Sequence, residues 1–156
     1  MERNLLGADV TRTSTDQKFR LGTTVTVGDA TYIYVKATAV ITQYYFCIIT
    51  AGSDATSPWG ATAMTTTNAG AIPQAVGCAQ VAFASGEYGW VAIAGKFTGF
   101  VGASCAQDVK LYTHATAGLV DDTATTLVSG VMLETTVSAA NQNAACYAFR
   151  EMSVNG

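Results

Sequence analysis

The chain has 156 residues, of which 49% are hydrophobic and only 12% charged, and its formal net charge is -3. An ordinary soluble domain has about 25% charged residues, and residues 37–86 of this chain contain a single one, Asp54. The few Lys and Arg residues are scattered, which excludes the basic surface typical of proteins that bind DNA or RNA, and the length suits one domain.

Residues 1–18 differ in composition from the rest of the chain. They hold a large share of the charge and few large apolar side chains after Leu5 and Leu6, so they are expected to form a loose, flexible arm. Two interpretations stay open, a frayed terminus and a segment that becomes ordered on a partner. In the second interpretation, Arg3, Leu5, Leu6 and Arg12 anchor the arm on that partner.

From residue 19 onward, short β-prone runs alternate with glycine-containing turns. Residues 21–27 and 31–36 flank Gly28 and Asp29. This pattern predicts a hairpin, because glycine supplies the positive φ that a tight turn needs. Residues 41–50 are too apolar for a strand with one exposed face, so this strand is expected to be covered on both faces.

The segment 51–70 is small, neutral and rich in Thr, Ala and Gly, which predicts a long loop with at most a short strand. Trp59 lies in this loop. An exposed Trp59 would be a contact anchor, since tryptophan is enriched at binding hot spots. The favoured interpretation is that Trp59 folds back over one end of the core.

The C-terminal half is expected to contain several more strands. Within residues 88–95, strict alternation places Trp90 on one face of a strand and Val91 and Ile93 on the other. A turn or two of helix is expected at most, at 103–108 or 138–145. The further strands are predicted at 76–84, 88–95, 96–101, 109–112, 126–128, 131–134 and 146–149. Together the runs predict one all-β domain over residues 19–156, a small β-barrel or a β-tulip or sandwich.

The cysteines show no metal-site spacing. Cys47, Cys78, Cys105 and Cys146 are widely separated, and the chain has one histidine, whereas zinc sites usually contain close pairs of ligands. Buried free thiols are favoured over disulfides for a protein made in a cytoplasm. No metal and no other cofactor is therefore expected.

The residues that could support catalysis are sparse. His114 lacks a Gly-x-Ser-x-Gly nucleophile elbow, so a loop role is favoured over a triad with Asp121 or Asp122. Those two aspartates could also hold Ca²⁺, but an ordinary acidic turn is favoured. Four further carboxylates are isolated in sequence: Glu87, Asp108, Glu134 and Glu151. We expect no enzyme, with a carboxylate-based hydrolase as the alternative, because a glycosidase pair need only meet in space.

The chain shows no targeting or membrane segment. Its start has no apolar run of signal-peptide length, and the longest apolar run, residues 44–49, is far below the roughly 18 residues that indicate a membrane span. We expect a soluble protein made in a cytoplasm, with neither a membrane nor a nucleic acid as its partner.

Several segments resemble small β-rich structural proteins of tailed bacteriophages. These segments are residues 21–25 with 29–37, residues 77–82 with 86–95, and residues 107–113 with 117–122 and 128–131. They are similar to the capsid decoration, or cement, proteins that bind the outside of an expanded phage head. The resemblance covers most of residues 19–133, and its motifs are patterns of turns and strands without catalytic signatures. The cysteines and the neutral loop at 51–70 depart from it.

The resemblance implies a homo-oligomer, commonly a trimer, at a symmetry axis of the capsid. Such a protein is made in the host cytoplasm, lies on the outer capsid surface of the virion and clamps neighbouring subunits of the major capsid protein. An N-terminal arm can join a capsid strand by β-addition, a role that suits residues 1–20. The alternative is a tail or head-fibre component that binds a host surface glycan through the loop around Trp59.

Overall fold

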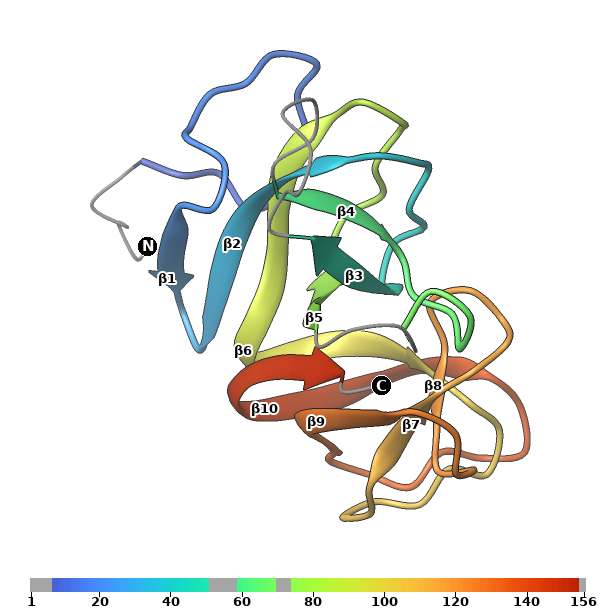
Figure 1. Ribbon diagram of the computed structural model, residues 1–156. Helices are drawn as coiled ribbons and strands as arrows, with labels where there is room; N and C mark the ends of the chain where they lie inside the picture. The colour runs from blue at the N-terminus through green and yellow to red at the C-terminus, as the bar shows by residue number, and fades with distance from the viewer. Residues whose placement is uncertain (1–6, 51–58, 70–73, 155–156) are drawn as a thin grey trace.

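The computed structural model describes residues 7–50, 59–69 and 74–154 (Figure 1). The strands are β1 (Thr24–Val27), β2 (Ala30–Ala37), β3 (Phe46–Thr50), β4 (Gly60–Ala63), β5 (Gln74–Ala79), β6 (Tyr88–Val101), β7 (Leu111–Thr113), β8 (Val120–Asp121), β9 (Leu127–Leu133) and β10 (Gln142–Val154). The predicted all-β class and single small domain are confirmed. No helix in the described ranges is long and apolar enough to cross a membrane.

All strands belong to one sheet, and their pairings close two circuits that share β6. The first circuit runs β2–β4–β3–β5–β6 and returns to β2. The second runs β6–β10–β9–β7–β8 and returns to β6. In Figure 1 the first circuit forms the upper half of the molecule and the second the lower half. The two halves are thus joined through the continuous strand β6, which belongs to both circuits.

The long strand β6 passes from one circuit to the other by bending at Gly95. Its first half pairs with β2, and its second half, from Gly95 onward, pairs with β10. Gly95 has a φ of +85°, and a Cβ atom there would lie 1.9 Å from the carbonyl oxygen of Asp29. The prediction of two strands at 88–95 and 96–101 is therefore wrong, because this glycine bends the strand without ending it.

Three strands form the wall between two large hydrophobic clusters. Along β3, Phe46 and Ile48 face the cluster of the second circuit, whereas Cys47 and Ile49 face that of the first. Side chains of β5 and β6 divide in the same way. The expectation that the strand within 41–50 is covered on both faces is confirmed, and all its residues from Phe46 to Ile49 are buried.

Other local predictions have mixed outcomes. The hairpin turn at Gly28 and Asp29 is confirmed by the antiparallel pairing of β1 with β2, and Trp90 lies on the opposite face of β6 from Val91 and Ile93, as predicted. The helical turns proposed at 103–108 and 138–145 are wrong. Residues 103–108 form turns, and β10 begins at Gln142 within the second segment. The short strand β8 was not predicted.

Residues 7–18 lie against the domain, in contrast to the loose arm expected for residues 1–18. Ala8 is buried in a third cluster with Val25, Tyr34 and Trp90. The backbone of Ser14 exchanges two hydrogen bonds with Tyr88, at 2.9 and 2.8 Å. The physical reason is that the sheet presents aromatic side chains on this face, and the polar segment covers them.

Candidate functional site

Of the four predicted arm anchors, the structure describes only Arg12. Arg3, Leu5 and Leu6 lie outside the described residues. Arg12 is exposed, and its Nε lies 3.5 Å from the carboxylate of Asp9. The hydroxyl and amide groups of Thr11 bond to the same carboxylate, which lowers the pKa of Asp9, and Arg12 adds to that effect. The guanidinium therefore remains on the surface with one local partner.

Beneath the arm lies a group of packed aromatic rings. The rings of Tyr34 and Trp90 have centroids 4.9 Å apart, and Phe19 meets both edge-on. The Tyr34 hydroxyl accepts a hydrogen bond from the backbone N–H of Lys18 at 3.0 Å. Since Tyr34 and Trp90 are almost completely buried, these rings fasten residues 7–19 to the sheet and offer little surface to a ligand.

Trp59 is half-buried and packs against the core of the first circuit. Its indole lies against Gly22, where a Cβ atom would come within 2.5 Å of the Trp59 ring. Its own φ is +57°, and its carbonyl accepts a hydrogen bond from Lys36 at 3.2 Å. This placement matches the favoured interpretation of a tryptophan folded back on the core. A role as an interface anchor stays a prediction.

His114, the histidine of the possible triad, and two of the isolated carboxylates, Glu87 and Glu134, have structural partners. The Nδ1 atom of His114 accepts a hydrogen bond from the backbone N–H of Thr116 at 2.9 Å, which closes a turn. Glu87 accepts a hydrogen bond from the N–H of Ala84 at 2.8 Å and closes another turn. Glu134 pairs with Lys96 at 3.0 Å across the sheet. Each of these groups therefore holds a turn or a strand pair in place.

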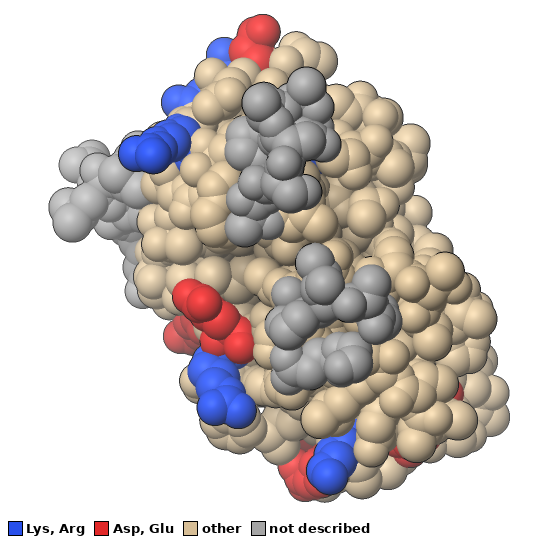
Figure 2. All heavy atoms as spheres, viewed as in Figure 1, with Lys and Arg blue, Asp and Glu red and all other residues tan. Residues whose placement is uncertain are grey.

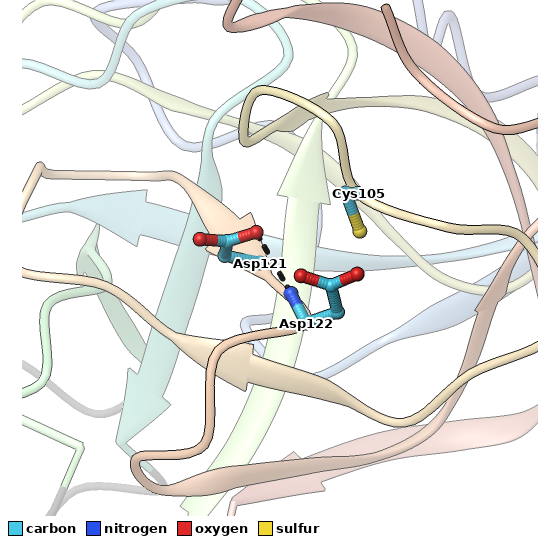
Figure 3. Close-up of side chains that lie close together, drawn as sticks. All are labelled: Cys105, Asp121 and Asp122. Atoms are coloured by element: carbon cyan, nitrogen blue, oxygen red, sulfur yellow. Dashed lines mark hydrogen bonds between the residues drawn. The ribbon is translucent and has the colours of Figure 1, made fainter. Parts of the chain in front are cut away.

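One cluster contains metal-ligand atom types. Cys105, Asp121 and Asp122 each place one ligand atom within 4.8 Å of the others, and Figure 3 shows the thiol on a loop and the two carboxylates at the end of β8. Asp121 accepts from the N–H of Asp122 at 2.8 Å, and Asp122 accepts from the N–H of Ala106 at 3.0 Å. The carboxylates thus act as caps for backbone donors, which favours the acidic turn expected from the sequence.

The thiol in this cluster is held in its protonated form. Burial, together with the negative charges of Asp122 and Asp121, raises the pKa of Cys105 to about 11. A metal-binding cysteine must be a thiolate, so binding of a metal here would release the thiol proton. The other three cysteines are also buried and free, as predicted.

A different surface stands out at the corner where β10 changes partners. Ala148 of β10 pairs with Val131 of β9, whereas Ser153 pairs with Ser129. Residues 149–152 therefore bulge opposite a single residue, Gly130. In the same span β10 leaves β6 and joins β5. Bulges of this kind redirect side chains out of the sheet.

Two aromatic side chains at and just before the bulge are exposed to solvent. Phe149 is 72% exposed and Tyr147 is 37% exposed. Their rings meet edge-on with centroids 5.1 Å apart. The small residues Cys146 and Ala148 occupy the buried face of the same strand. The strand thus turns its large side chains outward and its small ones inward.

Beside Phe149 lies an open groove of about 440 Å³, here named the bulge groove. Its lining is mainly apolar and comprises residues 108–110 on one side, residues 127–132 of β9 along the floor, and Phe149 and Arg150 on the other side. Gly130 in the floor has a φ of +90°, and a Cβ there would lie 3.2 Å from the carbonyl of Glu151. The glycine therefore permits both the bulge and the hollow above it.

Sequence reasoning missed the bulge groove. Residues 146–149 were recognised as a strand, but nothing in Cys-Tyr-Ala-Phe shows that the aromatic residues face outward. The available signal was the run of small residues on the alternate positions, Ala144, Cys146 and Ala148. Comparison with known proteins finds no matching family model, no similar curated protein and no similar solved structure.

Proposed function

We propose that this chain is a non-enzymatic structural protein of a bacteriophage virion. In this role it binds the outer surface of the expanded capsid and stabilises contacts between subunits of the major capsid protein. The observation that carries the proposal is the open apolar bulge groove with the exposed Phe149, on a molecule that is poor in charge. The sequence resemblance described above supplies the identity of the partner.

The surface supports a role in close contact with other protein. In Figure 2 the charged side chains form small groups near the margins, and a broad face between them carries none in the described residues. A surface with few charges has little electrostatic repulsion against neighbours. Burial of one phenylalanine contributes about 1.5–3 kcal/mol. Repetition of such a contact over a shell gives a large collective stabilisation through multivalency.

The assembly and location follow from the same proposal. The protein is made in the host cytoplasm, joins the head after expansion, and occupies a symmetry axis as a homo-oligomer, with a trimer favoured. The glycan-binding alternative, a tail or head-fibre component, has less support, because its key residue Trp59 packs against the core.

The decisive experiment is co-sedimentation of the purified chain with expanded empty heads of the parent phage, alongside unexpanded shells. We expect saturable binding to expanded heads alone, and the number of copies bound per head identifies the symmetry axis. Absence of binding to both shells would contradict the proposal and direct the search to the tail and the host surface.

The contribution of the N-terminal anchors is tested separately. Deletion of residues 1–6 removes Arg3, Leu5 and Leu6 but retains the contacts of residues 7–18 with the sheet. If these residues anchor the chain, the deletion should abolish sedimentation with expanded heads while the circular dichroism spectrum stays unchanged. A matched Arg12→Ser variant tests the fourth anchor. Binding that survives both changes would refute the anchor hypothesis.

A further inference from the structure

We propose that the bulge groove is a docking site for an extended, acidic and apolar peptide segment of a partner protein. The inference rests on the proposed function and deepens it, because it names a docking surface outside the N-terminal anchors and states the chemistry of what binds there. Three observations carry it: the shape of the groove, the free edge of β9, and the charges on the two walls.

The shape of the groove suits an extended chain. Its floor follows β9 from Leu127 to Met132, with Val109 on one wall and Phe149 on the other. Val109 is 38% exposed, although it is apolar. A groove that follows a strand accommodates a peptide in the extended conformation, and its apolar walls accept apolar side chains.

The edge of β9 supplies unused backbone partners for such a peptide. β9 pairs with β7 only at Leu127 and Val128. From Ser129 to Leu133 it pairs with β10 on one side, and the described residues include no strand on its other side. A strand edge without a neighbouring strand is a template for β-addition. The free edge therefore favours a polypeptide as the occupant over a lipid or a small apolar molecule.

The charges on the walls define the chemistry of the flanking residues. Lys110 lies on one wall and Arg150 on the other, and among the described residues neither has a carboxylate partner within ion-pair distance. Asp108 also lines the groove, so its charged lining sums to +1. Elsewhere in the described chain Arg12, Lys18 and Lys96 have ion-pair partners, whereas Arg20 and Lys36 have none there. Two free cations on opposite walls are complementary to a segment whose apolar side chains are flanked by carboxylates.

The first test uses the full chain, labelled with nitrogen-15, and two synthetic peptides with blocked ends. One peptide is Asp-Leu-Val-Phe-Val-Asp, and the other replaces both Asp residues by Lys. We expect saturable amide shifts at Val109, Gly130 and Met132 with the acidic peptide. Its affinity should exceed that of the lysine peptide at least about fivefold at low salt, and the difference should shrink as salt is added.

Variants assign the effect to the groove. Phe149→Asp should abolish the shifts, and the double variant Lys110→Glu with Arg150→Glu should reverse the preference between the two peptides. Val40→Asp is the matched control, because Val40 is 69% exposed and lies outside the groove. It should leave both affinities unchanged. Equal affinity for the two peptides, or no saturable shift in the groove, would overturn the inference.

The same variants separate this inference from the proposed function. Peptide binding in the groove without binding of the intact chain to phage heads contradicts the proposed function and leaves the groove assignment in place. Heads that bind Phe149→Asp as well as they bind the unchanged chain contradict the groove as the docking surface and leave the proposed function in place.

Discussion

Gly95 controls the direction of the strand that connects the two circuits. Its positive φ and its close approach to the carbonyl of Asp29 both exclude a side chain. From the sequence this glycine was interpreted as a break between strands, since glycine usually weakens a strand. Its neighbours on both sides remain paired, first with β2 and then with β10. Only the long-range pairing distinguishes a bend from a break, and a single sequence does not contain that information.

Gly95→Ala is expected to lower the free energy of unfolding by about 3 kcal/mol or more, because both the backbone conformation and the contact with Asp29 become strained. Gly86→Ala is the matched control. Gly86 has a φ of +87°, but no atom lies within 4 Å of the position of its Cβ. Gly86→Ala should therefore lower the free energy of unfolding by only about 1 kcal/mol, which is the cost of the backbone conformation alone. Urea unfolding measures both, and equal losses would contradict the role given to the Asp29 contact.

The buried thiols give the stability of the protein an alkaline limit. Burial raises the pKa of Cys47 to about 12 and that of Cys146 to about 12. A thiol in an unfolded chain has a pKa of about 8.5. As the pH rises, the unfolded chain therefore loses its thiol protons first. The stabilisation is complete below pH ~8.5 and is lost between that pH and the folded pKa.

Each such thiol should reduce the free energy of unfolding by up to about 1.4 kcal/mol per pH unit within this window. Cys47→Ala should make the decline between pH 9 and 10.5 shallower by about that amount, whatever its effect at pH 7. Urea unfolding in the presence of a reductant, repeated at several pH values, measures the slope. An identical slope in both proteins would show that Cys47 does not contribute.

At the scale of elements, strands with a clear local sequence pattern could be predicted. Strands that form only because of their tertiary packing could not. The turn at Gly28 and Asp29 and the apolar run at Phe46–Thr50 carry their own signals, and both are confirmed. The segment at 138–145 is rich in alanine, which favours a helix. Its C-terminal part joins β10 because Ala144 and Cys146 pack inward against the hydrophobic cluster of the second circuit. Tertiary packing overrides the local propensity there.

The candidate site was harder to predict than the fold. A strand that reads Cys-Tyr-Ala-Phe normally buries its large aromatic residues, yet here the interior is already occupied by side chains such as Phe46 and Phe97. The bulge at 149–152 depends on Gly130, a residue distant in sequence. The exposure of Phe149 therefore follows from two long-range relations that the local pattern does not reveal.

The segment 7–16 acts as a cover for the aromatic face of the sheet, and its removal should be detectable. We expect deletion of residues 1–16 to shift the emission of Trp90 to longer wavelength and to lower the free energy of unfolding by about 2 kcal/mol. The deletion removes the contact of Ala8 and both backbone bonds of Ser14. A Trp59→Phe background leaves Trp90 as the only emitting tryptophan.

The control for this experiment is deletion of residues 1–6 in the same background. It retains Ala8 and Ser14, so the emission of Trp90 should stay unchanged. If the longer deletion also leaves the emission unchanged, residues 7–16 do not shield Trp90 in solution, and their role as a cover is incorrect.

At the scale of the whole molecule, the shared wall couples the two circuits. Because β3, β5 and β6 contribute side chains to both large clusters, neither cluster can be exposed without disturbing the other. Small domains with one continuous packing arrangement usually unfold in a single transition. The two-circuit molecule is therefore expected to behave as one cooperative unit.

Phe46→Ala tests this coupling, since Phe46 is fully buried on the side of the second circuit and its ring meets that of Phe97 at 5.9 Å. We expect a loss of about 3–5 kcal/mol. In the Trp59→Phe background, urea transitions followed by Trp90 fluorescence, near the first circuit, and by far-ultraviolet circular dichroism should keep coincident midpoints. Separation of the two midpoints would show that the circuits unfold independently.

The position of β10 in the chain has a consequence for biosynthesis. β10 is the last strand, and it pairs with β5, β6 and β9. Until Val154 has left the ribosomal tunnel, the nascent chain has three strands with unfilled edges, and such edges favour association with other chains. Folding dominated by pairings between distant strands is also slow. Emergence of β10, more than emergence of the early hairpin, therefore sets the moment at which the edges of β5, β6 and β9 become paired.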